Sequence, residues 1–199
     1  MEIYEAKEIL YDVYRDVNGG CISSEERSRR GHSSKNFVYG EINPDSSKQI
    51  FDIIRPQEGE LFCDLGSGVG KNVLFLSLIY PFSKLYGIEI LENLSKESKK
   101  AAERLYKKVP KDYKLPKIEF INANFLHVDF SNMDVLYACS TCFSEDLMLS
   151  IAKNASLMKK NSKVITLTKE LPSTNHEKIF CEQFPMSWGN GTVNIFRKI

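Results

Sequence analysis

The sequence lacks any long uninterrupted apolar run. Of its 199 residues, 42% are hydrophobic and 27% are charged, which is the balance of an ordinary soluble globular protein. No window approaches the roughly 18 consecutive apolar residues that a membrane span needs. The first 17 residues mix acids and bases and contain neither the basic nor the apolar segment of a secretory signal. We therefore expect no membrane partner and a cytoplasmic or nuclear location.

The sequence also lacks a strong excess of charge of one sign. Its formal net charge is +1, whereas a general electrostatic grip on DNA or RNA requires a strongly basic face. Nucleic-acid binding would therefore depend on a local patch, and Arg27, Arg29 and Arg30 in the N-terminal region are the candidates. We expect a monomer, and a nucleic-acid partner is possible but is not indicated by the net charge.

No metal or disulfide framework is evident. The chain has an odd number of cysteines: Cys21, Cys63, Cys139, Cys142 and Cys181. An odd set, partly inside apolar runs, favours reduced thiols. Structural zinc needs four ligands, and CSTC has no second CxxC or paired histidines beside it. The histidines, His32, His127 and His176, are scattered through polar segments, and we expect them at the surface.

Helical periodicity marks the first quarter of the chain. Apolar residues at spacings of three and four predict an amphipathic helix within residues 2–17. Residues 18–36 are rich in Gly, Ser and charge and have no apolar period, which predicts a mobile or substrate-gating loop. Another helix is expected at residues 46–54, capped by Ser46 or Ser47 and ending before Pro56.

From residue 60 onward, extended and helical runs alternate. Extended runs are expected at 60–65, 84–90, 117–123, 135–139 and 162–168, and helical runs at 72–80, 94–109 and 145–158. This alternation predicts a parallel sheet with helices on both faces. Two further extended runs, joined by Gly189, Asn190 and Gly191, predict a hairpin. We therefore predict an α/β fold with a seven-stranded, mostly parallel sheet ending in an antiparallel hairpin, preceded by a helical extension.

The glycine-rich segment after the first extended run is the most informative motif. Asp64 ends an apolar run and leads into Gly66, Gly68 and Gly70, which allow the backbone to turn tightly beside a ligand. Ligands of open α/β sheets bind beyond the carboxyl ends of the strands. Glu89, about 20 residues further on, is placed to accept hydrogen bonds from the two hydroxyls of a ribose. The pattern predicts an adenosine site.

Two rival nucleotide motifs are absent. The dinucleotide pattern GxGxxG would need glycine at Lys71, and Asp64 would repel a pyrophosphate. The P-loop pattern GxxxxGK[ST] is also missing, since Asn72 follows Lys71. S-adenosylmethionine carries an ammonium and a sulfonium instead of phosphates. We therefore predict a Rossmann-like class I methyltransferase that uses S-adenosylmethionine and releases S-adenosylhomocysteine. The alternative is that the glycine-rich turn has only a structural role and binds no ligand.

Four segments together carry a resemblance to a known family. They are FVYGE at 37–41, DLGSGVGK at 64–71, YGIE at 86–89 and MSWGNGTV at 186–193. From about Asn36 to its end, the chain resembles the disruptor-of-telomeric-silencing family, the histone lysine methyltransferases without a SET domain. The resemblance implies a protein substrate with an accessible lysine. With the glycine loop, it implies cofactor contacts from Tyr39, Glu41, Asp64, Gly66, Ser67, Gly68, Gly70, Lys71, Glu89, Asn124, Phe125 and Ser140.

The chain departs from the family's pattern at several positions. Lys71 stands where the family usually has glutamine, and Asn124 where it has an acid before Phe125. The family's NNFAF segment is replaced by residues 139–143, CSTCF, and Asn194 or Ile195 lies near the place of its channel tyrosine. Because of these departures, the resemblance does not identify the methyl acceptor, and it does not imply specificity for histones.

Methyl transfer to an amine requires a neutral nucleophile held about 3–3.5 Å from the methyl carbon. A lysine, with a free pKa near 10.4, must lose its proton, which a desolvated channel beside a cationic sulfonium would favour. We predict Ser140, Thr141 and Tyr39 as the catalytic residues that orient it. The alternative for Ser140 and Thr141 is a strand-end turn that satisfies its own backbone.

Other acceptors remain open. The [DN]PP[YF] motif of many amino-methyltransferases is absent. Cys139 or Cys142 could serve as the thiolate of a pyrimidine C5 methyltransferase, or simply line the pocket. The alternatives are therefore a nucleic-acid or small-molecule methyltransferase and an inactive S-adenosylmethionine-binding module. We expect residues 1–56 to form a helical extension with a cofactor-covering loop and residues 57–199 to form the methyltransferase core, together one compact domain.

Overall fold

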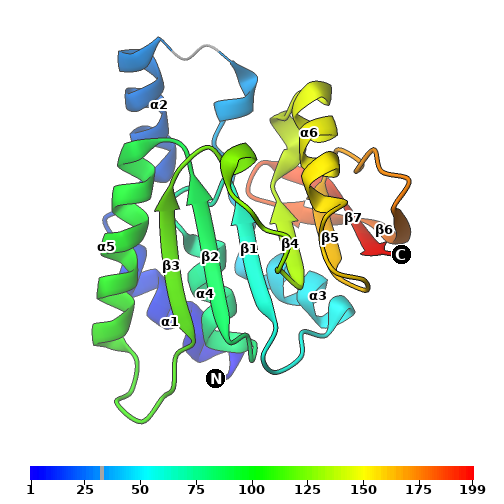
Figure 1. Cartoon of the computed structure of the whole chain (residues 1–199). Helices are drawn as coiled ribbons and strands as arrows, with labels where there is room; N and C mark the ends of the chain where they lie inside the picture. The colour runs from blue at the N-terminus through cyan, green and yellow to red at the C-terminus, as the bar shows by residue number, and fades with distance from the viewer. Residues whose placement is uncertain (32–33) are drawn as a thin grey trace.

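A computed structural model describes residues 1–31 and 34–199. Its centre is a seven-stranded sheet in the order β3-β2-β1-β4-β5-β7-β6 (Figure 1). The strands are β1 (Leu61–Leu65), β2 (Lys84–Glu89), β3 (Lys117–Asn122), β4 (Val135–Ala138), β5 (Lys163–Leu167), β6 (His176–Met186) and β7 (Gly189–Lys198). Strands β1 to β5 pair in parallel, and β7 pairs antiparallel with β5 and β6. The predicted sheet is confirmed.

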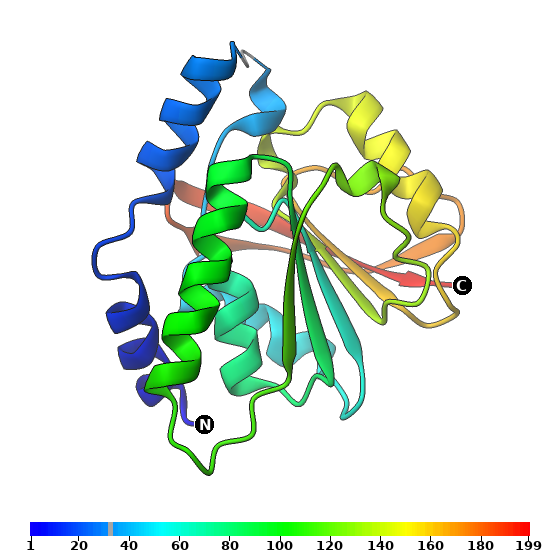
Figure 2. The same cartoon turned by 60° about the vertical axis from the view of Figure 1, so that its left-hand side comes forward.

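Helices cover both faces of this sheet (Figures 1 and 2). They are α1 (Ile3–Tyr14), α2 (Gly19–Arg30), α3 (Pro44–Ile54), α4 (Lys71–Ile79), α5 (Glu92–Lys108) and α6 (Glu145–Ala155), with short 3₁₀ turns η1 (Lys35–Phe37), η2 (Phe125–His127) and η3 (Ser140–Cys142). Because side chains alternate along a strand, Phe62 belongs to the core cluster that contains residues of α1, α3, α4 and α5, whereas its neighbour Cys63 belongs to the cluster that contains residues of α6. None of the described helices combines the length and the apolar character needed to cross a bilayer.

The N-terminal region contains one confirmed helix and one correction. Helix α1 lies within the predicted residues 2–17. The predicted loop at 18–36 is wrong for most of its length, because residues 19–30 form α2. The Asn18 side chain caps α2 by accepting a hydrogen bond from the Cys21 N–H at 3.0 Å, and Gly31, in the left-handed region, ends it. Helix α2 buries Ser23 and Glu26 instead of aliphatic residues, so it has no apolar period to detect.

The start of α3 is also corrected. Helix α3 begins at Pro44, and its cap is Asn43, whose side chain accepts a hydrogen bond from the Ser46 N–H at 2.8 Å. The two serines predicted as caps are buried inside the helix. Ser47 donates to the Asn72 side-chain oxygen at 2.7 Å, so it connects α3 to α4 instead of capping α3.

The turn of the hairpin lies two residues earlier than predicted. Met186 pairs with Gly189, so Ser187 and Trp188 form the turn, while Gly189 to Gly191 belong to β7. Trp188 packs on Gly40, where an added Cβ would lie only 2.9 Å from the indole. This tertiary contact, which local sequence cannot reveal, fixes the position of the turn.

Two of the histidines fall within the described residues. His127 is exposed, as expected. His176 is buried, which corrects the prediction; its Nδ1 lies 2.8 Å from the Ser173 hydroxyl, and burial lowers the pKa of the ring. His32 lies outside the described residues. Across residues 1–31 and 34–199, no group of three or more His, Cys, Asp or Glu side chains is placed to hold a metal ion.

Candidate ligand-binding site

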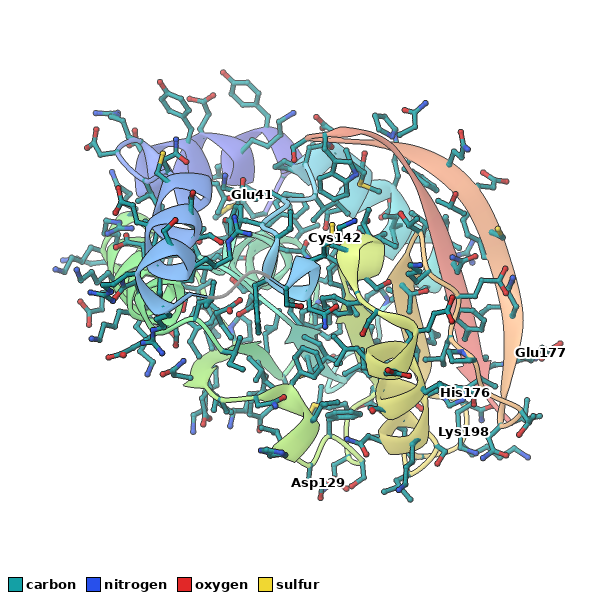
Figure 3. All side chains as sticks on the ribbon, turned by 90° about the horizontal axis from the view of Figure 1, so that it is seen from above. Glu41, Asp129, Cys142, His176, Glu177 and Lys198 are labelled. Carbon is teal, nitrogen blue, oxygen red and sulfur yellow. The ribbon has the colours of Figure 1, made fainter. Side chains whose placement is uncertain are left out.

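A cavity of about 250 Å³ opens at the carboxyl ends of β1, β2 and β4. Ten of the predicted site residues line it: Tyr39, Glu41, Asp64, Gly66, Ser67, Gly68, Lys71, Glu89, Asn124 and Phe125. Figure 3 looks down on this edge of the sheet, with Glu41 and Cys142 over the middle of the molecule and His176 and Glu177 at its rim. The tertiary structure thus brings together segments that lie up to 86 residues apart (Tyr39 to Phe125).

The glycine loop and Glu89 form the floor of the cavity. The N–H groups of Gly66 and Ser67 donate to the Ile88 carbonyl at 2.8 and 3.1 Å, which ties the loop to the end of β2. Glu89 is buried, and its two carboxylate oxygens accept hydrogen bonds from the N–H groups of Gly68 (2.9 Å) and Leu91 (2.8 Å). Burial raises the pKa of Glu89, and these backbone hydrogen bonds partly offset the rise. Each carboxylate oxygen keeps a lone pair for a ligand hydroxyl.

Asp64 is a second buried carboxyl group in the same cavity. It is 3% exposed, and among the described residues its Oδ1 has no hydrogen-bond partner. Burial, followed by the negative charge of Glu89, raises the pKa of Asp64 to about 8, and the neighbouring Asn72 amide offsets part of this rise. A buried carboxylate without a partner is costly. The site therefore favours a cationic ligand group at Asp64.

Tyr39, Glu41 and Lys71 form a polar network that also lines the cavity. The Tyr39 hydroxyl donates to one oxygen of Glu41, and the Lys71 ammonium pairs with the other. Burial, followed by the charge of Glu41, raises the pKa of Tyr39 well above its ordinary value. A Cβ on Gly68 would lie 2.7 Å from the Tyr39 ring, and Gly68 has a φ of +56°. Glycine at 68 is thus required both by its backbone conformation and by the close approach of the tyrosine.

The remaining wall of the cavity is apolar. The rings of Phe125 and Phe143 lie 5.9 Å apart between centroids, and Leu91, Leu94, Leu126 and Leu147 complete this wall. Asn124 holds η2 in place by accepting a hydrogen bond from the Leu126 N–H at 3.0 Å. Flat apolar surfaces of this kind suit a planar aromatic ring.

Three predicted site residues do not line the cavity. Ser140 is fully buried and donates to the Leu167 carbonyl at 2.8 Å. The Thr141 hydroxyl lies 3.0 Å from that of Thr168. Gly70 packs against Phe120, which a Cβ would approach to 2.4 Å. The hydroxyls of Ser140 and Thr141 therefore bond to residues at the end of β5, which differs both from the predicted catalytic role and from a turn that satisfies its own backbone.

Cys139 does line the cavity, as the pocket-lining alternative expected. Burial, followed by the charge of Asp64, raises the pKa of Cys139 to about 12. Its thiol is therefore protonated at neutral pH. A protonated thiol is a poor nucleophile, so this geometry gives no support to a thiolate mechanism at Cys139.

Several cavity residues escaped sequence analysis. Asn36 accepts a hydrogen bond from the Ser144 N–H at 2.7 Å, joining the segment before Tyr39 to the start of α6. Asn72 and Tyr137 place buried polar groups at the cavity. Asn72 follows the glycine loop directly, which was a usable signal, whereas Tyr137 sits within an apolar strand and looks like an ordinary core residue.

Comparisons with known proteins agree with this geometry. The family described as "Histone methylation protein DOT1" matches residues 21–183. A histone-lysine N-methyltransferase described as H3 lysine-79 specific, from Eremothecium gossypii, is 28% identical over 173 residues, covering 82% of this chain and 30% of that protein. A protein of the same description from Dictyostelium discoideum is 30% identical over 186 residues, covering 85% of this chain and 10% of that protein. The chain thus spans about a third or less of these relatives.

Solved structures show the same fold at low sequence identity. TrmN from Thermus thermophilus superposes with a TM-score of 0.67 at 16% identity, covering 83% of this chain and 52% of that one. Magnesium protoporphyrin IX methyltransferase from Synechocystis PCC 6803 superposes with a TM-score of 0.61 at 14% identity, covering 98% of this chain and 97% of that one. The Rossmann-like class I methyltransferase fold is therefore shared.

Proposed function

Because the chain belongs to the DOT1 family of histone methylation proteins, we propose that it is an S-adenosylmethionine-dependent methyltransferase that acts on a lysine side chain of a protein. The main observation that supports this cofactor is a pair of buried carboxyl groups in one cavity. They belong to Asp64 and Glu89, at the ends of adjacent parallel strands. Pyrophosphate would be repelled there, whereas an ammonium and a ribose are accommodated.

The residues present fit this cofactor part by part. Glu89 would accept hydrogen bonds from the ribose hydroxyls, and the apolar wall around Phe125 would hold the adenine. Asp64, whose Oδ1 has no partner among the described residues, would take the ammonium. Lys71 and Glu41 would close the site as an ion pair, and the turn through Gly66, Ser67 and Gly68 lets the backbone approach the ligand.

When bound, S-adenosylmethionine supplies an electrophilic methyl group on a sulfonium. The chain's own task is to hold a neutral amine in line with it. Tyr39 lines the cavity, and its hydroxyl donates to Glu41; a lone pair on the same oxygen would accept a hydrogen bond from an N–H donor such as a lysine amine. Tyr39 is therefore our proposed orienting residue. Ser140 and Thr141 are left out because their hydroxyls are bonded elsewhere.

The proposed acceptor is a protein lysine, with histone H3 as the first candidate because the relatives carry that specificity in their names. The chain covers only 30% and 10% of the lengths of those two proteins. For this reason histone H3 is proposed as the first acceptor to test and is not assigned as the substrate. Residues 139–143, which replace the family's NNFAF segment, are where we expect acceptor preference to differ.

The test combines cofactor binding with transfer. The chain is incubated with methyl-labelled S-adenosylmethionine and, in parallel, with nucleosomes, free histones and total cell extract, and labelled products are digested and identified. We expect methyl-lysine in a protein. Glu89→Ala, which removes a charged hydrogen-bond acceptor, should lose about 1.5–3 kcal/mol of cofactor binding energy per bond.

The alternatives are distinguished by where the label goes. Label that resists protease but is released by nuclease would replace the lysine proposal with a nucleic-acid methyltransferase. Tight cofactor binding without label in any fraction would indicate an inactive binding module. Unchanged affinity in Glu89→Ala would contradict the cofactor site itself.

A further inference from the structure

Helix α1 packs against α4 and α5 (Figure 2) and ends in a buried tyrosine, Tyr14. The apolar side chains of Ala6, Leu10 and Val13 are buried in the core cluster that also contains residues of α4 and α5. The Val13 carbonyl accepts a hydrogen bond from the Arg104 side chain of α5 at 2.8 Å. These contacts fix the last turn of α1, and Tyr14 with it.

Tyr14 contacts two parts of the candidate site without lining the cavity itself. Its hydroxyl donates to the Val69 carbonyl, in the glycine loop, at 2.9 Å. Its ring centroid lies 5.2 Å from the Lys71 ammonium, and a cation within about 6 Å of a ring centroid is attracted to the face of the ring. Tyr14 is buried and is not one of the residues that line the cavity. It therefore supports the loop and Lys71 from the side of the protein core.

The surroundings of Tyr14 keep its hydroxyl protonated and its ring beside a cation. Burial, followed by the negative charge of Glu41, raises the pKa of Tyr14 well above its ordinary value, so the hydroxyl is a donor throughout the neutral range. Glu41 also pairs with the Lys71 ammonium. This ammonium is therefore attracted both by a carboxylate and by the face of an aromatic ring.

The glycine loop has reason to need support from outside. Its three glycines have φ values of +82°, +56° and +83°, and glycine loses more conformational freedom on folding than any other residue. Toward β2, the loop is held by hydrogen bonds to the Ile88 carbonyl and the Glu89 carboxylate. Tyr14 bonds to the Val69 carbonyl, between the second and the third glycine. It thus holds the part of the loop that leads into α4.

We propose that Tyr14 is a positioning residue for the cofactor site: its hydroxyl holds the glycine loop at Val69, and its ring holds the Lys71 ammonium in place beside Glu41. This inference rests on the proposed function, in which the cavity binds S-adenosylmethionine. Tyr14 acts through Val69 and Lys71 and is not a catalytic residue. The proposal extends the functional site to α1, which precedes the residues 21–183 that match the family.

The hydroxyl is tested by Tyr14→Phe, which removes one oxygen atom and keeps the ring. Calorimetric titration of S-adenosylhomocysteine into the full chain measures the affinity, and urea unfolding measures the stability. We expect binding to weaken by roughly three- to tenfold, the range of one net hydrogen bond, because the loop is no longer held at Val69.

Tyr113→Phe is the matched control. The Tyr113 hydroxyl donates to the Leu78 carbonyl at 2.6 Å, near the opposite end of α4, and Tyr113 does not line the cavity. Both variants lose a hydrogen bond from a tyrosine to a backbone carbonyl, so both should unfold at a lower urea concentration. Only Tyr14→Phe should weaken the binding of S-adenosylhomocysteine, which separates positioning of the site from general stability.

The ring is tested by Tyr14→Leu, compared with Tyr14→Phe in two backgrounds. With Lys71 present, Tyr14→Leu should bind S-adenosylhomocysteine roughly two- to fivefold more weakly than Tyr14→Phe, the range of a cation–π contact. In a Lys71→Met background, where no cation faces the ring, the two variants should bind equally. A difference that persists in that background would come from packing and would overturn the role assigned to the ring.

The role assigned to the hydroxyl has its own contrary results. Unchanged affinity in Tyr14→Phe would overturn it, and so would an equal loss of affinity in Tyr113→Phe. Failure of the proposed function looks different, because the unmodified chain would then not bind S-adenosylhomocysteine at all.

Discussion

The Glu26 carboxylate of α2 accepts a hydrogen bond from the backbone N–H of Asn93, in the first turn of α5, at 2.8 Å. Its other oxygen accepts from the Glu92 N–H at 3.0 Å, while the residue that precedes α5, Leu91, offers no side-chain cap. Helix α5 is therefore capped by a carboxylate from another helix, which also interacts favourably with the helix dipole.

Glu26→Ala should therefore destabilise the fold. The side chain of Glu26 is fully buried and also pairs with Arg30 at 3.0 Å, so its loss leaves two backbone N–H groups without a partner. We expect a loss of about 1–2 kcal/mol in the free energy of unfolding, the range for a lost helix cap, measured by urea denaturation. Glu25→Ala, at an exposed neighbour, is the control. Equal stability of the two variants would show that α2 does not cap α5 in solution.

The raised pKa of Asp64 predicts a pH-dependent stability for the free chain. The folded-state pKa is about 8, and an unfolded aspartate titrates near 3.9, so between these values the folded chain binds the extra proton. Stability from this group is then fully present below about pH 4 and lost as pH rises through 8. Asp64→Asn removes this dependence.

Urea unfolding at pH 5 and at pH 8.5 measures the effect. The unmodified chain should lose more stability than Asp64→Asn between the two pH values. S-adenosylhomocysteine should reduce the difference, because its ammonium stabilises the ionised carboxylate. Parallel behaviour of the two proteins without ligand would place the pKa of Asp64 in its ordinary range.

The contact between Gly40 and Trp188 predicts a coupled pair of substitutions. A Cβ at residue 40 would meet the indole at 2.9 and 3.1 Å, so Gly40→Ala should displace Trp188 and disturb the adjacent Tyr39 and Glu41. We expect a several-fold loss of S-adenosylhomocysteine affinity. Adding Trp188→Ala should restore part of it, since residues in contact are non-additive. Strictly additive effects in this double-mutant cycle would argue against the contact.

Thiol reactivity provides a further test of the site. Cys21 and Cys181 are exposed, whereas burial raises the pKa of Cys139 to about 12 and also raises that of Cys63. Because the thiolate is the reactive form, iodoacetamide at pH 8 should label Cys21 and Cys181 first. Mass spectrometry of tryptic peptides measures the order, and labelling in urea provides the control. Rapid labelling of Cys139 would revive a nucleophilic role for it.

Much of the fold was predictable because its signals are local. The alternation of apolar runs with amphipathic stretches, seen at 60–65 and 72–80 for example, reflects strand and helix geometry that each segment imposes on its own. Helix α2 was missed because its buried residues, Ser23 and Glu26, are polar. Their partners are distant in the sequence: Glu26 accepts from the first N–H groups of α5, and Ser23 donates to the Phe37 carbonyl. The hairpin turn was misplaced because Trp188 packs on Gly40, 148 residues earlier in the chain.

The sequence by itself determined the central residues of the binding site. Asp64, the glycine loop and Glu89 follow directly from the order of strand, turn and strand, because parallel strands present their carboxyl ends at one edge of the sheet. Only the tertiary structure decided which polar groups remain unpaired there. Ser140 donates to the Leu167 carbonyl, whereas the Tyr137 hydroxyl has no hydrogen-bond partner among the described residues. The physical reason is that hydrogen-bond satisfaction depends on contacts between distant segments, and a sequence pattern does not specify those contacts.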